Sequence, residues 1–600
     1  MESHQNIKKY LVDFQAKLFK ASKEHLRKNI DSLKNTNPSK AYSILKKMGA
    51  QPGELEEIST FTLPEHEHLS IPDAAEKIVE HFSRISSEFP PLDPVNLPNR
   101  VSTKIRNPES ESLAPEILEH EVYTRICKAN KPKAGVPGDL PKKLINEFGP
   151  ELAVPVTKIF NDIMNTARKG PAKWPITWKQ EFGTPLQKVP DPQTEDDLRI
   201  ISLTAFFSKV MEKFVVEWLM KFISKRLDPK QFGGLKGNSI SHYLIELINF
   251  ILYNQDHDLP IAILACAIDF SKAFNRQNHN ILIVKLSDMG VPGRLLNLVM
   301  GFLVDRVMLL RYRGATTDSK PLPGGGPQGT LLGLLLFLVL INDCGFDNEK
   351  EEEKVGETIT QKKKKFNSPV LHTKFVDDLT VLEAINMKDA LVPNPVRPLP
   401  DAYHARLGMK LDNEKSKVYR QIENIQKYAE QNDMKLNVDK CKFMVFNPTK
   451  NYDFIPDLNI EGNQIATAEE MKLLGLTIRS DLKWKSNTDT MVTKGYKRLW
   501  MIKRLKSHGA SIDDLKEIYI KQIRSVLEFG VPVWNNGLSK AEVVEIERIQ
   551  KAFLHIALGT EYHSYNEALE TAKLKTLENR RLKPCATIAK KCANHPKHRS

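Results

Sequence analysis

The chain has 600 residues, of which 41% are hydrophobic and 27% are charged. This length and composition exclude a small single-core protein and a low-complexity chain, and they predict several packed subdomains. The formal net charge of +14 suits a polyanion such as nucleic acid, although an anionic membrane or a merely soluble basic surface would also fit the charge alone.

The cysteines and the apolar runs indicate the compartment. Six cysteines are scattered without a Cys-x-x-Cys pair, which argues against a disulfide framework. The N-terminus lacks the apolar stretch of a secretory signal, and the longest apolar run, Leu331 to Ile341, is too short to span a bilayer. We therefore expect an intracellular protein of the nucleus, the cytoplasm or both, with no secretion and no membrane partner.

The first half of the chain has mainly helical patterns. Basic helix-like stretches fill residues 1–85, and the proline-rich segment 89–98 predicts a boundary. Apolar residues at three- and four-residue steps predict an amphipathic helix from Val210 to Leu227. A second apolar helix is expected at about 240–253.

Strands and polar insertions follow. An apolar strand is expected at 261–269, and the run from Leu331 to Ile341 predicts a buried helix. Polar segments at 348–365 and 392–400 predict solvated loops, and the lysine run in the first of them fits a loop better than a targeting signal. After about 488 the pattern is again helical.

Two adjacent acids, Asp377 and Asp378, lie between apolar β-forming residues, which predicts a hairpin whose tight turn is made of these acids. Like charges at one turn repel, and a divalent cation would neutralise them. A third acid, Asp269, ends the separate strand that begins at Ile261. Two acidic sites carried by strands and converging on metal are typical of phosphoryl transfer to or from a nucleotide triphosphate, and they predict a polymerase.

Five positions after Asp269 stands Phe274. In a polymerase site this ring would lie under the sugar of the incoming nucleotide and would clash with a 2′-hydroxyl, which favours deoxynucleotides. A phenylalanine of the hydrophobic core remains the alternative for this residue.

A glycine-rich loop, 321–333, lies between the two acidic segments. Its glycines allow the backbone to approach a ligand closely, and the following helix N-terminus favours anions. Gln328 offers a donor and an acceptor to a base or a sugar, so we take Gln328 and Gly329 as candidate nucleotide-binding residues.

These segments resemble the three central palm motifs of reverse transcriptases, most closely those of non-LTR (LINE-type, jockey-like) retrotransposons. The resemblance is carried by Asp269–Phe274, Gly326–Phe337 and Phe375–Asp378, and it continues outward in the same order through segments 178–188, 198–203, 436–446, 473–484 and 519–534. It covers roughly residues 120–560. The family usually has Asp, Pro and Ser where this chain has Asn275, Ile200 and Thr330, which puts catalytic efficiency in doubt without removing a metal ligand.

The resemblance implies roles for individual residues. Asp269 and Asp377 would hold two Mg²⁺ ions, with Mn²⁺ as an alternative, helped by the carbonyl of Ile268 and supported by Asp378. Lys188 and Arg199 would neutralise phosphate oxygens of the nucleotide. Lys440 would either protonate the leaving pyrophosphate or bind phosphate.

The implied fold is α+β: a right-hand polymerase with helical fingers, a palm with an antiparallel sheet, a helical thumb and an N-terminal helical extension. The expected boundaries are 1–115 for the extension and linker, 116–260 for the fingers, 261–486 for the palm with insertions near 346–368 and 386–415, and 487–600 for the thumb and tail. The implied partners are an RNA template, a DNA primer and dNTPs. Nothing before residue 120 resembles an endonuclease, so a separate nicking enzyme is expected as a partner.

Two features of the C-terminal part stay open. Basic residues alternate with Trp500 between Tyr496 and Lys506, which fits a helix that follows a nucleic-acid backbone and equally a solvated helix with core residues. The tail between Cys585 and His598 has a spacing that fits no common zinc site.

Two other functions compete with reverse transcription. An RNA-dependent RNA polymerase would share the palm and the metals. Such enzymes typically have a polar acid near the position of Phe274, and the aromatic ring here argues against this function. A catalytically silent, RNA-binding derivative of a reverse transcriptase is disfavoured by the presence of all three carboxylates.

Overall fold

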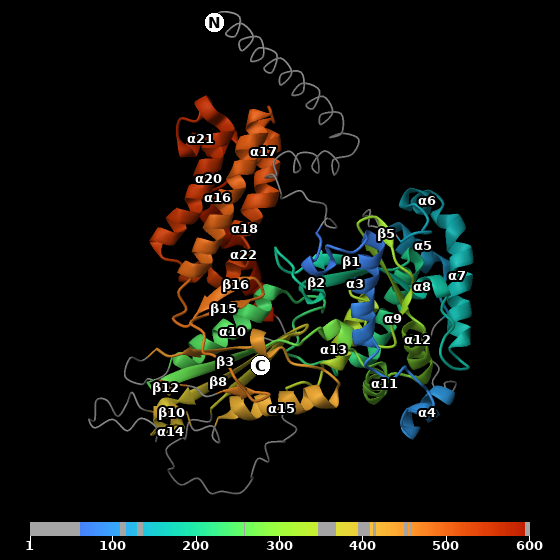
Figure 1. Cartoon of the computed structure of the whole chain (residues 1–600). Coiled ribbons are helices and arrows are strands. Elements are labelled where there is room, and N and C mark those ends of the chain that lie inside the picture. Colours follow the sequence, from blue (N-terminus) through green and yellow to red (C-terminus); the bar gives the residue numbers. More distant parts are fainter. Residues whose placement is uncertain are drawn as a thin grey trace, which may run out of the picture.

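The computed structural model describes residues 61–107, 116–128, 136–256, 258–345, 368–393, 409–411, 416–448, 454–455 and 458–594. Helices and strands alternate irregularly along the chain, and the expected α+β class is confirmed. Figure 1 shows a lobe of C-terminal helices above a central sheet, with a second group of helices on the opposite side of the molecule. Lys362–Lys365, His595 and His598 lie outside the described residues.

The central sheet has four antiparallel strands in the order β11-β3-β8-β7. Their bounds are Lys442–Phe446 (β11), Ile261–Ile268 (β3), Asp378–Asn386 (β8) and Val370–Phe375 (β7). Alternate residues of β3 pack in different hydrophobic cores. Leu264 belongs to the larger core, and Ile263 belongs to the core that includes the C-terminal helices. The sheet is therefore covered on both faces, which explains the nearly continuous apolar sequence of β3.

A second sheet joins segments that are distant in the sequence. Its order is β2-β1-β4-β5, with β6 also paired to β4. The bounds are Gln180–Gln187 (β1), Leu198–Leu203 (β2), Val307–Tyr312 (β4), Ala315–Thr316 (β5) and Lys320–Pro321 (β6). Helix α3 (Ile71–Ser86) packs on this sheet in a separate core that includes Ile78, Ile200 and Leu310 (Figure 1). Helix α3 is thus an integral part of the fold.

Helices cover the two sheets. Those of the first half are α4 (Asn99–Arg106), α5 (Glu119–Lys128), α6 (Lys142–Glu147), α7 (Gly149–Thr166), α8 (Ile176–Lys179), α9 (Phe206–Ile223), α10 (Ile240–Gln255), α11 (His279–Asp288), α12 (Gly293–Leu303) and α13 (Leu331–Leu340). The expected helices at 210–227, 240–253 and 331–341 correspond to α9, α10 and α13, although α9 ends before Leu227. In the described parts of the chain, no helix is long and apolar enough to cross a membrane.

Smaller elements flank the central sheet. They are α14 (Met387–Ala390), β9 (Leu391–Pro393), β10 (Met409–Leu411), α15 (Lys417–Gln431), β12 (Phe454–Ile455), β13 (Asn459–Ile460), β14 (Asn463–Gln464), β15 (Glu470–Leu473) and β16 (Leu476–Arg479). The hairpin β15–β16 connects the central sheet to the C-terminal lobe.

The C-terminal lobe is helical, as its sequence pattern predicted. Its helices are α16 (Lys485–Ser507), α17 (Ile512–Ile518), α18 (Ser525–Leu527), α19 (Val531–Trp534), α20 (Lys540–Leu558), α21 (Tyr565–Thr571) and α22 (Leu577–Asn594), with a π-helical turn at Tyr519–Arg524. Tyr519 stacks on Phe553 at 4.1 Å between ring centroids and holds this turn against α20. Cys585 and Cys592 lie on α22 as free thiols.

Candidate active site

The hairpin that carries Asp377 and Asp378 forms as predicted, but its turn differs. Phe375 pairs directly with Asp378, so the two turn residues are Val376 and Asp377, and Asp378 opens strand β8. The prediction that both acids make the turn is wrong, because the two-residue loop leaves Asp378 paired in the sheet as the first residue of β8. Val376 takes a left-handed conformation (φ 62°), which is unfavourable for a β-branched residue.

Asp269 lies beside this doublet. Strand β3 pairs with β8 so that Ile268 is opposite Leu379, and the next residue, Asp269, therefore leaves the sheet beside Asp378. The backbone carbonyl of Asp269 accepts a hydrogen bond from the N–H of Asn437 at 2.8 Å. The sheet register thus gathers three acids from two distant segments of the chain.

Burial raises the pKa of all three carboxyl groups. Burial raises the pKa of Asp378 to about 6, and the charges of Asp377 and Asp269 add to the rise. Burial also raises the pKa of Asp377, with a further rise from Asp269 and a partial offset from Arg199. The pKa of Asp269 is raised by burial despite the opposing charge of Lys440. The site therefore disfavours the ionised form of each of these carboxyl groups.

Such a site fits hard divalent cations. Carboxylate oxygens are the ligands that Mg²⁺ and Mn²⁺ prefer, and a cation would stabilise the ionised form of these buried acids. Among the described residues, no three His, Cys, Asp or Glu side chains are already gathered at metal-binding positions. The carboxylates would therefore turn toward a bound ion.

The raised pKa of Asp378 predicts how metal affinity depends on pH. Below about 6 the carboxyl is protonated, and a metal ion must displace that proton. We expect Mn²⁺ affinity, measured by calorimetry, to fall by up to about tenfold per pH unit as the pH drops below this value. Asp378→Asn should bind Mn²⁺ more weakly and with a flatter pH profile. Affinity that stays constant through this range in the native chain would contradict the prediction.

The turn at Val376 is held by a side-chain amide. The Oε1 of Gln231 accepts the N–H groups of Val376 (3.0 Å) and Gly233 (2.8 Å), and its Nε2 donates to the carbonyl of Val376 (3.4 Å). A Cβ at Gly233 would lie 2.4 Å from the nitrogen of Val376, so only glycine permits this approach. Gln231 therefore stabilises the strained turn that presents Asp377.

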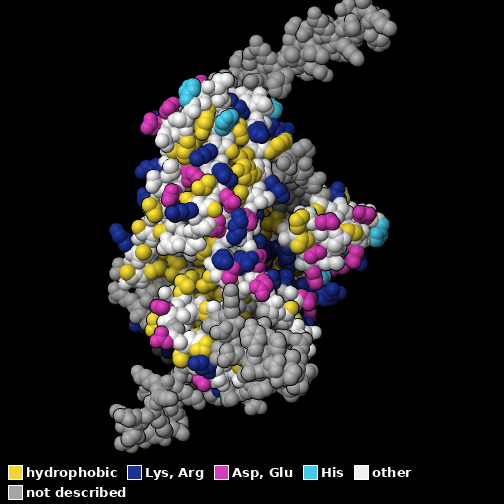
Figure 2. Space-filling model, turned by 90° about the vertical axis from the view of Figure 1, so that its left-hand side faces the viewer, with side chains coloured by type: hydrophobic (Ala, Val, Ile, Leu, Met, Phe, Trp, Pro, Cys, Tyr) yellow, Lys and Arg dark blue, Asp and Glu magenta, His cyan; other side chains and the backbone are white. Residues whose placement is uncertain are grey.

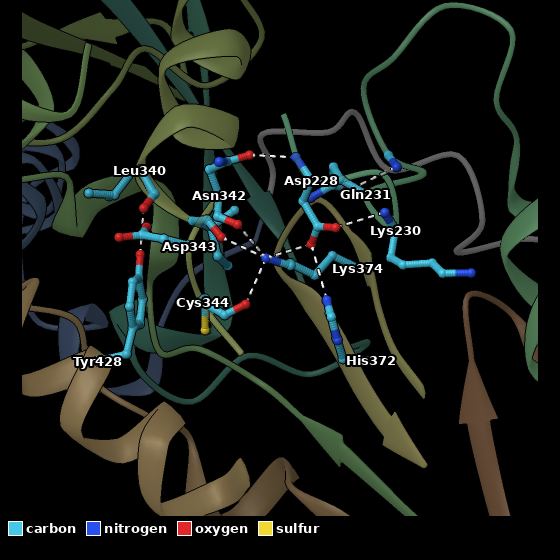
Figure 3. Close-up of polar contacts among 12 residues, drawn as sticks. Asp228, Lys230, Gln231, Leu340, Asn342, Asp343, Cys344, His372, Lys374 and Tyr428 are labelled. Atoms are coloured by element: carbon cyan, nitrogen blue, oxygen red, sulfur yellow. Dashed lines mark hydrogen bonds and ion pairs between the residues drawn. The ribbon is translucent and has the colours of Figure 1, made fainter. Parts of the chain in front are cut away.

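A buried lysine anchors the same hairpin (Figure 3). The ammonium of Lys374, which is fully buried, contacts the carbonyls of Ile341 (3.0 Å), Asn342 (2.8 Å) and Cys344 (2.7 Å). It also lies 2.9 Å from the carboxylate of Asp228, which is buried as well. Lys374 thus ties strand β7 to the end of α13 and to the segment after α9.

The glycine-rich loop lies between Phe274 and the second sheet. The N–H of Gly326 donates to the carbonyl of Phe274 (2.9 Å), and the carbonyl of Gln328 accepts from Ser202 on β2 (3.0 Å). Gly325 takes a left-handed conformation (φ 79°). The half-buried ring of Phe274 stacks on Phe337 of α13 at 4.7 Å between centroids. This packing fits the core interpretation and leaves its role in sugar selection a prediction.

Three predicted cations surround the acids. Lys188 follows β1 directly, Arg199 lies on β2, and the ammonium of Lys440 is 3.9 Å from the carboxylate of Asp269. The pKa of Lys188 is lowered by burial and then by the charges of Lys440, Arg199 and Lys272. The cations are thus close enough to repel one another, and an anion between them would be stabilised.

The C-terminal lobe supports both interpretations of its first helix. Tyr496 and Trp500 on α16 remain exposed at 47% and 37%, whereas Leu499 and Ile502 are buried in the core. On the face drawn in Figure 2, Lys and Arg side chains gather between the large upper lobe and the smaller lobe at the right. A basic surface with exposed aromatic rings suits nucleic acid.

Sequence reasoning missed several residues of this site. Gln231, Lys272, Lys374 and Asn437 reach it only through contacts between distant segments. Lys272 and Asn437 lie within recognised motifs and Lys374 directly precedes one, whereas Gln231 lies outside all of them.

Comparisons with known proteins agree with this geometry. Residues 188–478 match the family model described as "Reverse transcriptase (RNA-dependent DNA polymerase)". The chain is 22% identical over 509 residues to the RNA-directed DNA polymerase from mobile element jockey of Drosophila melanogaster, covering 82% of this chain and 50% of that protein. It is 29% identical over 178 residues to the probable RNA-directed DNA polymerase from transposon BS of the same species, covering 29% of this chain and 19% of that protein.

The chain thus spans half the length, or less, of these two curated relatives. Among solved structures, telomerase from Candida albicans in complex with a fragment of telomeric RNA matches with a TM-score of 0.32 at 12% identity. That match covers 69% of this chain and 68% of the telomerase chain.

Proposed function

Since residues 188–478 of this chain form a reverse transcriptase domain, we propose that the chain extends the 3′ end of a primer with deoxynucleotides while copying an RNA template. The resemblance to jockey-like enzymes that the motifs indicated is confirmed for this domain. The observation that carries the proposal is the convergence of Asp269, Asp377 and Asp378 at one end of the central sheet.

The proposed roles follow from the positions of the residues. Asp269 and Asp377 would hold two divalent ions, with the carbonyl of Ile268 and the carboxylate of Asp378 in support. Reverse transcriptases normally use such ions, which would supply charge neutralisation at the reacting phosphate and activation of the primer hydroxyl. Lys188 and Arg199 would bind phosphate oxygens of the nucleotide.

Lys440 lies near enough to Asp269 to act at the same phosphates. It would donate a proton to the leaving pyrophosphate or bind it as a cation, two roles that differ in their dependence on pH. Gln328 and Gly329 would contact the base or sugar of the nucleotide from the glycine-rich loop.

We also propose the domain division given by the sequence, with an N-terminal extension at 1–115, fingers at 116–260, a palm at 261–486 that includes the central sheet, and a thumb and tail at 487–600. The second sheet then takes β1 and β2 from the fingers and β4, β5 and β6 from the palm. RNA template, DNA primer and dNTPs are the proposed partners. Copying at a nick made by a separate endonuclease is a further element of the proposal, based on the resemblance to retrotransposon enzymes.

The test is primer extension on poly(rA)/oligo(dT) with Mg²⁺ and the purified chain. We expect dTTP to be incorporated, UTP to be rejected, and the reaction to stop with a chelator. Incorporation of UTP in preference to dTTP would favour an RNA-dependent RNA polymerase. Tight RNA binding without any incorporation would favour the silent RNA-binding alternative.

Phe274 provides a test of sugar selection. Phe274→Val should remove the ring that would clash with a 2′-hydroxyl and relax discrimination against UTP by at least roughly 10- to 200-fold, the range that a single methylene group gives in a hydrophobic pocket. The ratio of kcat/KM for dTTP and UTP measures the effect. Because Phe274 also stacks on Phe337, a thermal melt of the variant must accompany the assay. An unchanged ratio in a folded variant would leave Phe274 as a core residue only.

A further inference from the structure

A charged cluster beside the proposed nucleotide site has no assigned role. The ammonium of Lys272 lies 2.6 Å from the carboxylate of Asp196 and 3.4 Å from the imidazole of His81. The imidazole of His81 is itself 2.8 Å from the carboxylate of Asp196. The three residues come from the segment after Asp269, the turn between β1 and β2 (Glu195–Asp197), and helix α3.

This cluster is continuous with the phosphate-binding residues proposed above. The ammonium of Lys188 donates to the backbone carbonyl of Asp196 at 2.8 Å. The pKa of Lys188 is lowered by burial and by three neighbouring cations, among them Lys272, while Asp196 acts in the opposite direction. Lys272 is therefore one of four cations that share a small volume next to the three catalytic acids.

The pair between Lys272 and Asp196 is suited to exchange. The side chain of Asp196 is 58% exposed, so breaking its ion pair requires little reorganisation, and such pairs contribute little to stability. Lys272 is only 22% exposed and takes a left-handed conformation (φ 52°). A triphosphate carries more negative charge than a single carboxylate and would compete successfully for this ammonium.

We propose that Lys272 is a further ligand of the nucleotide's triphosphate, and that Asp196 holds its ammonium as an exchangeable internal anion until the nucleotide binds. The inference rests on the proposed function, because it names an additional residue for the same nucleotide site. In it, His81 connects helix α3 to the nucleotide-binding surface.

A purely structural pair is the alternative, in which Lys272 and Asp196 only fasten α3 and the turn to the central sheet. Helix α3 has other attachments: its apolar core with β2 and β4, and the hydrogen bond from Ser83 to the carbonyl of Pro321 (2.8 Å). Loss of one exposed ion pair should therefore leave α3 in place. The two explanations predict different effects of removing the Asp196 carboxylate on phosphate affinity. Affinity should rise only if this carboxylate competes with the ligand for Lys272.

The experiment measures binding of inorganic tripolyphosphate to the full chain by calorimetry in Mg²⁺, and in parallel the KM for dTTP in primer extension. Lys272→Met should weaken tripolyphosphate binding roughly 10- to 100-fold, as expected for loss of a charge-assisted contact. Asp196→Asn should strengthen it by up to about fivefold, the range of an exposed pair. The KM for dTTP should rise in the first variant and fall in the second.

Lys320→Met is the matched control. Lys320 also pairs with helix α3, through Glu76 (3.2 Å) and Glu80 (3.3 Å), at a similar exposure of 28%, but on strand β6. We expect its tripolyphosphate affinity to equal that of the native chain. Weaker binding in both Lys272→Met and Asp196→Asn, no change in Lys272→Met, or an equal loss in Lys320→Met would overturn the proposal.

Tripolyphosphate binding requires no turnover, so the two proposals can fail separately. A native chain that binds tripolyphosphate through Lys272 but extends no primer would refute the polymerase and keep this assignment. Active primer extension with unchanged binding in Lys272→Met would do the reverse.

Discussion

Asp377→Ala is expected to abolish primer extension while the protein remains folded. Metal-assisted charge stabilisation contributes several kcal/mol at the transition state, so removing a principal ligand should lower kcat by roughly a thousandfold or more. The measurement is dTTP incorporation on poly(rA)/oligo(dT), with a thermal melt of the same preparation.

The stability of this variant should not fall. Burial and the neighbouring Asp269 raise the pKa of Asp377, which means that its ionised form is disfavoured in the metal-free fold. Removing the carboxylate should leave the melting temperature equal or higher at neutral pH. Native activity is thus expected to come at the expense of stability, as at other functional sites.

Asp288→Asn serves as the control for an acidic substitution. Asp288 pairs with Arg100 through exposed side chains at 2.9 Å, on the end of α11. We expect normal primer extension from this variant. Comparable activity in Asp377→Ala and the native chain would refute the assignment of the metal site.

Lys374→Met is expected to cause the largest loss of stability. It would leave the carboxylate of Asp228 buried without its cation and three backbone carbonyls without their donor. Breaking one side of a buried pair typically costs about 3–5 kcal/mol. Denaturant unfolding of the full chain, followed by circular dichroism, measures this loss.

The pH dependence of stability tests the same network. Burial alone would raise the pKa of Asp228, but the imidazole of His372 at 3.6 Å and the charge of Lys374 outweigh it and lower the pKa to about 2. A depressed carboxyl pKa stabilises the fold above its ordinary value of 3.8 and loses that contribution as the pH falls toward about 2. The stability difference between the native chain and Asp228→Asn should therefore shrink over this acidic range.

Two comparison variants separate the buried pair from ion pairs in general. Arg100→Gln removes the exposed pair with Asp288 and should leave the unfolding curve nearly unchanged. The double variant Lys374→Met/Asp228→Asn should be less damaging than the sum of its single changes, because neither buried charge is then left alone. Additive effects would show that Lys374 acts mainly on the carbonyls at the end of α13.

Local patterns were sufficient for much of the fold. The apolar run at 331–341 predicted a buried helix, and alternating β-forming residues predicted the hairpin that carries the acids. These predictions succeed because helix and strand periodicities depend on residues close together in the chain. The boundary between turn and strand at Asp378 was missed, because pairing with Phe375 decides it.

The contacts of helix α3 could not be predicted from its local sequence. Residues 89–98 predicted a boundary, and the pattern before them predicted only basic helices. The structure instead packs Ile78 of α3 with Ile200 and Leu310 of the second sheet and brings His81 to the proposed nucleotide site. Those partners are more than a hundred residues away, and nothing in the helix's own sequence identifies them.

By itself, the sequence determined the identity of the three acids, their order among the motifs and the family to which residues 188–478 belong. Functions that only a few residue types can perform are recognisable in a sequence. A magnesium site needs carboxylates, and a close approach of the backbone to a ligand needs glycine. Only the tertiary structure decided that Lys374 is buried against Asp228, that Gln231 supports the turn at Val376, and that Lys272 meets Asp196. The local sequence around each of these side chains is equally compatible with a position on the surface. Burial and pairing depend instead on the packing of distant segments.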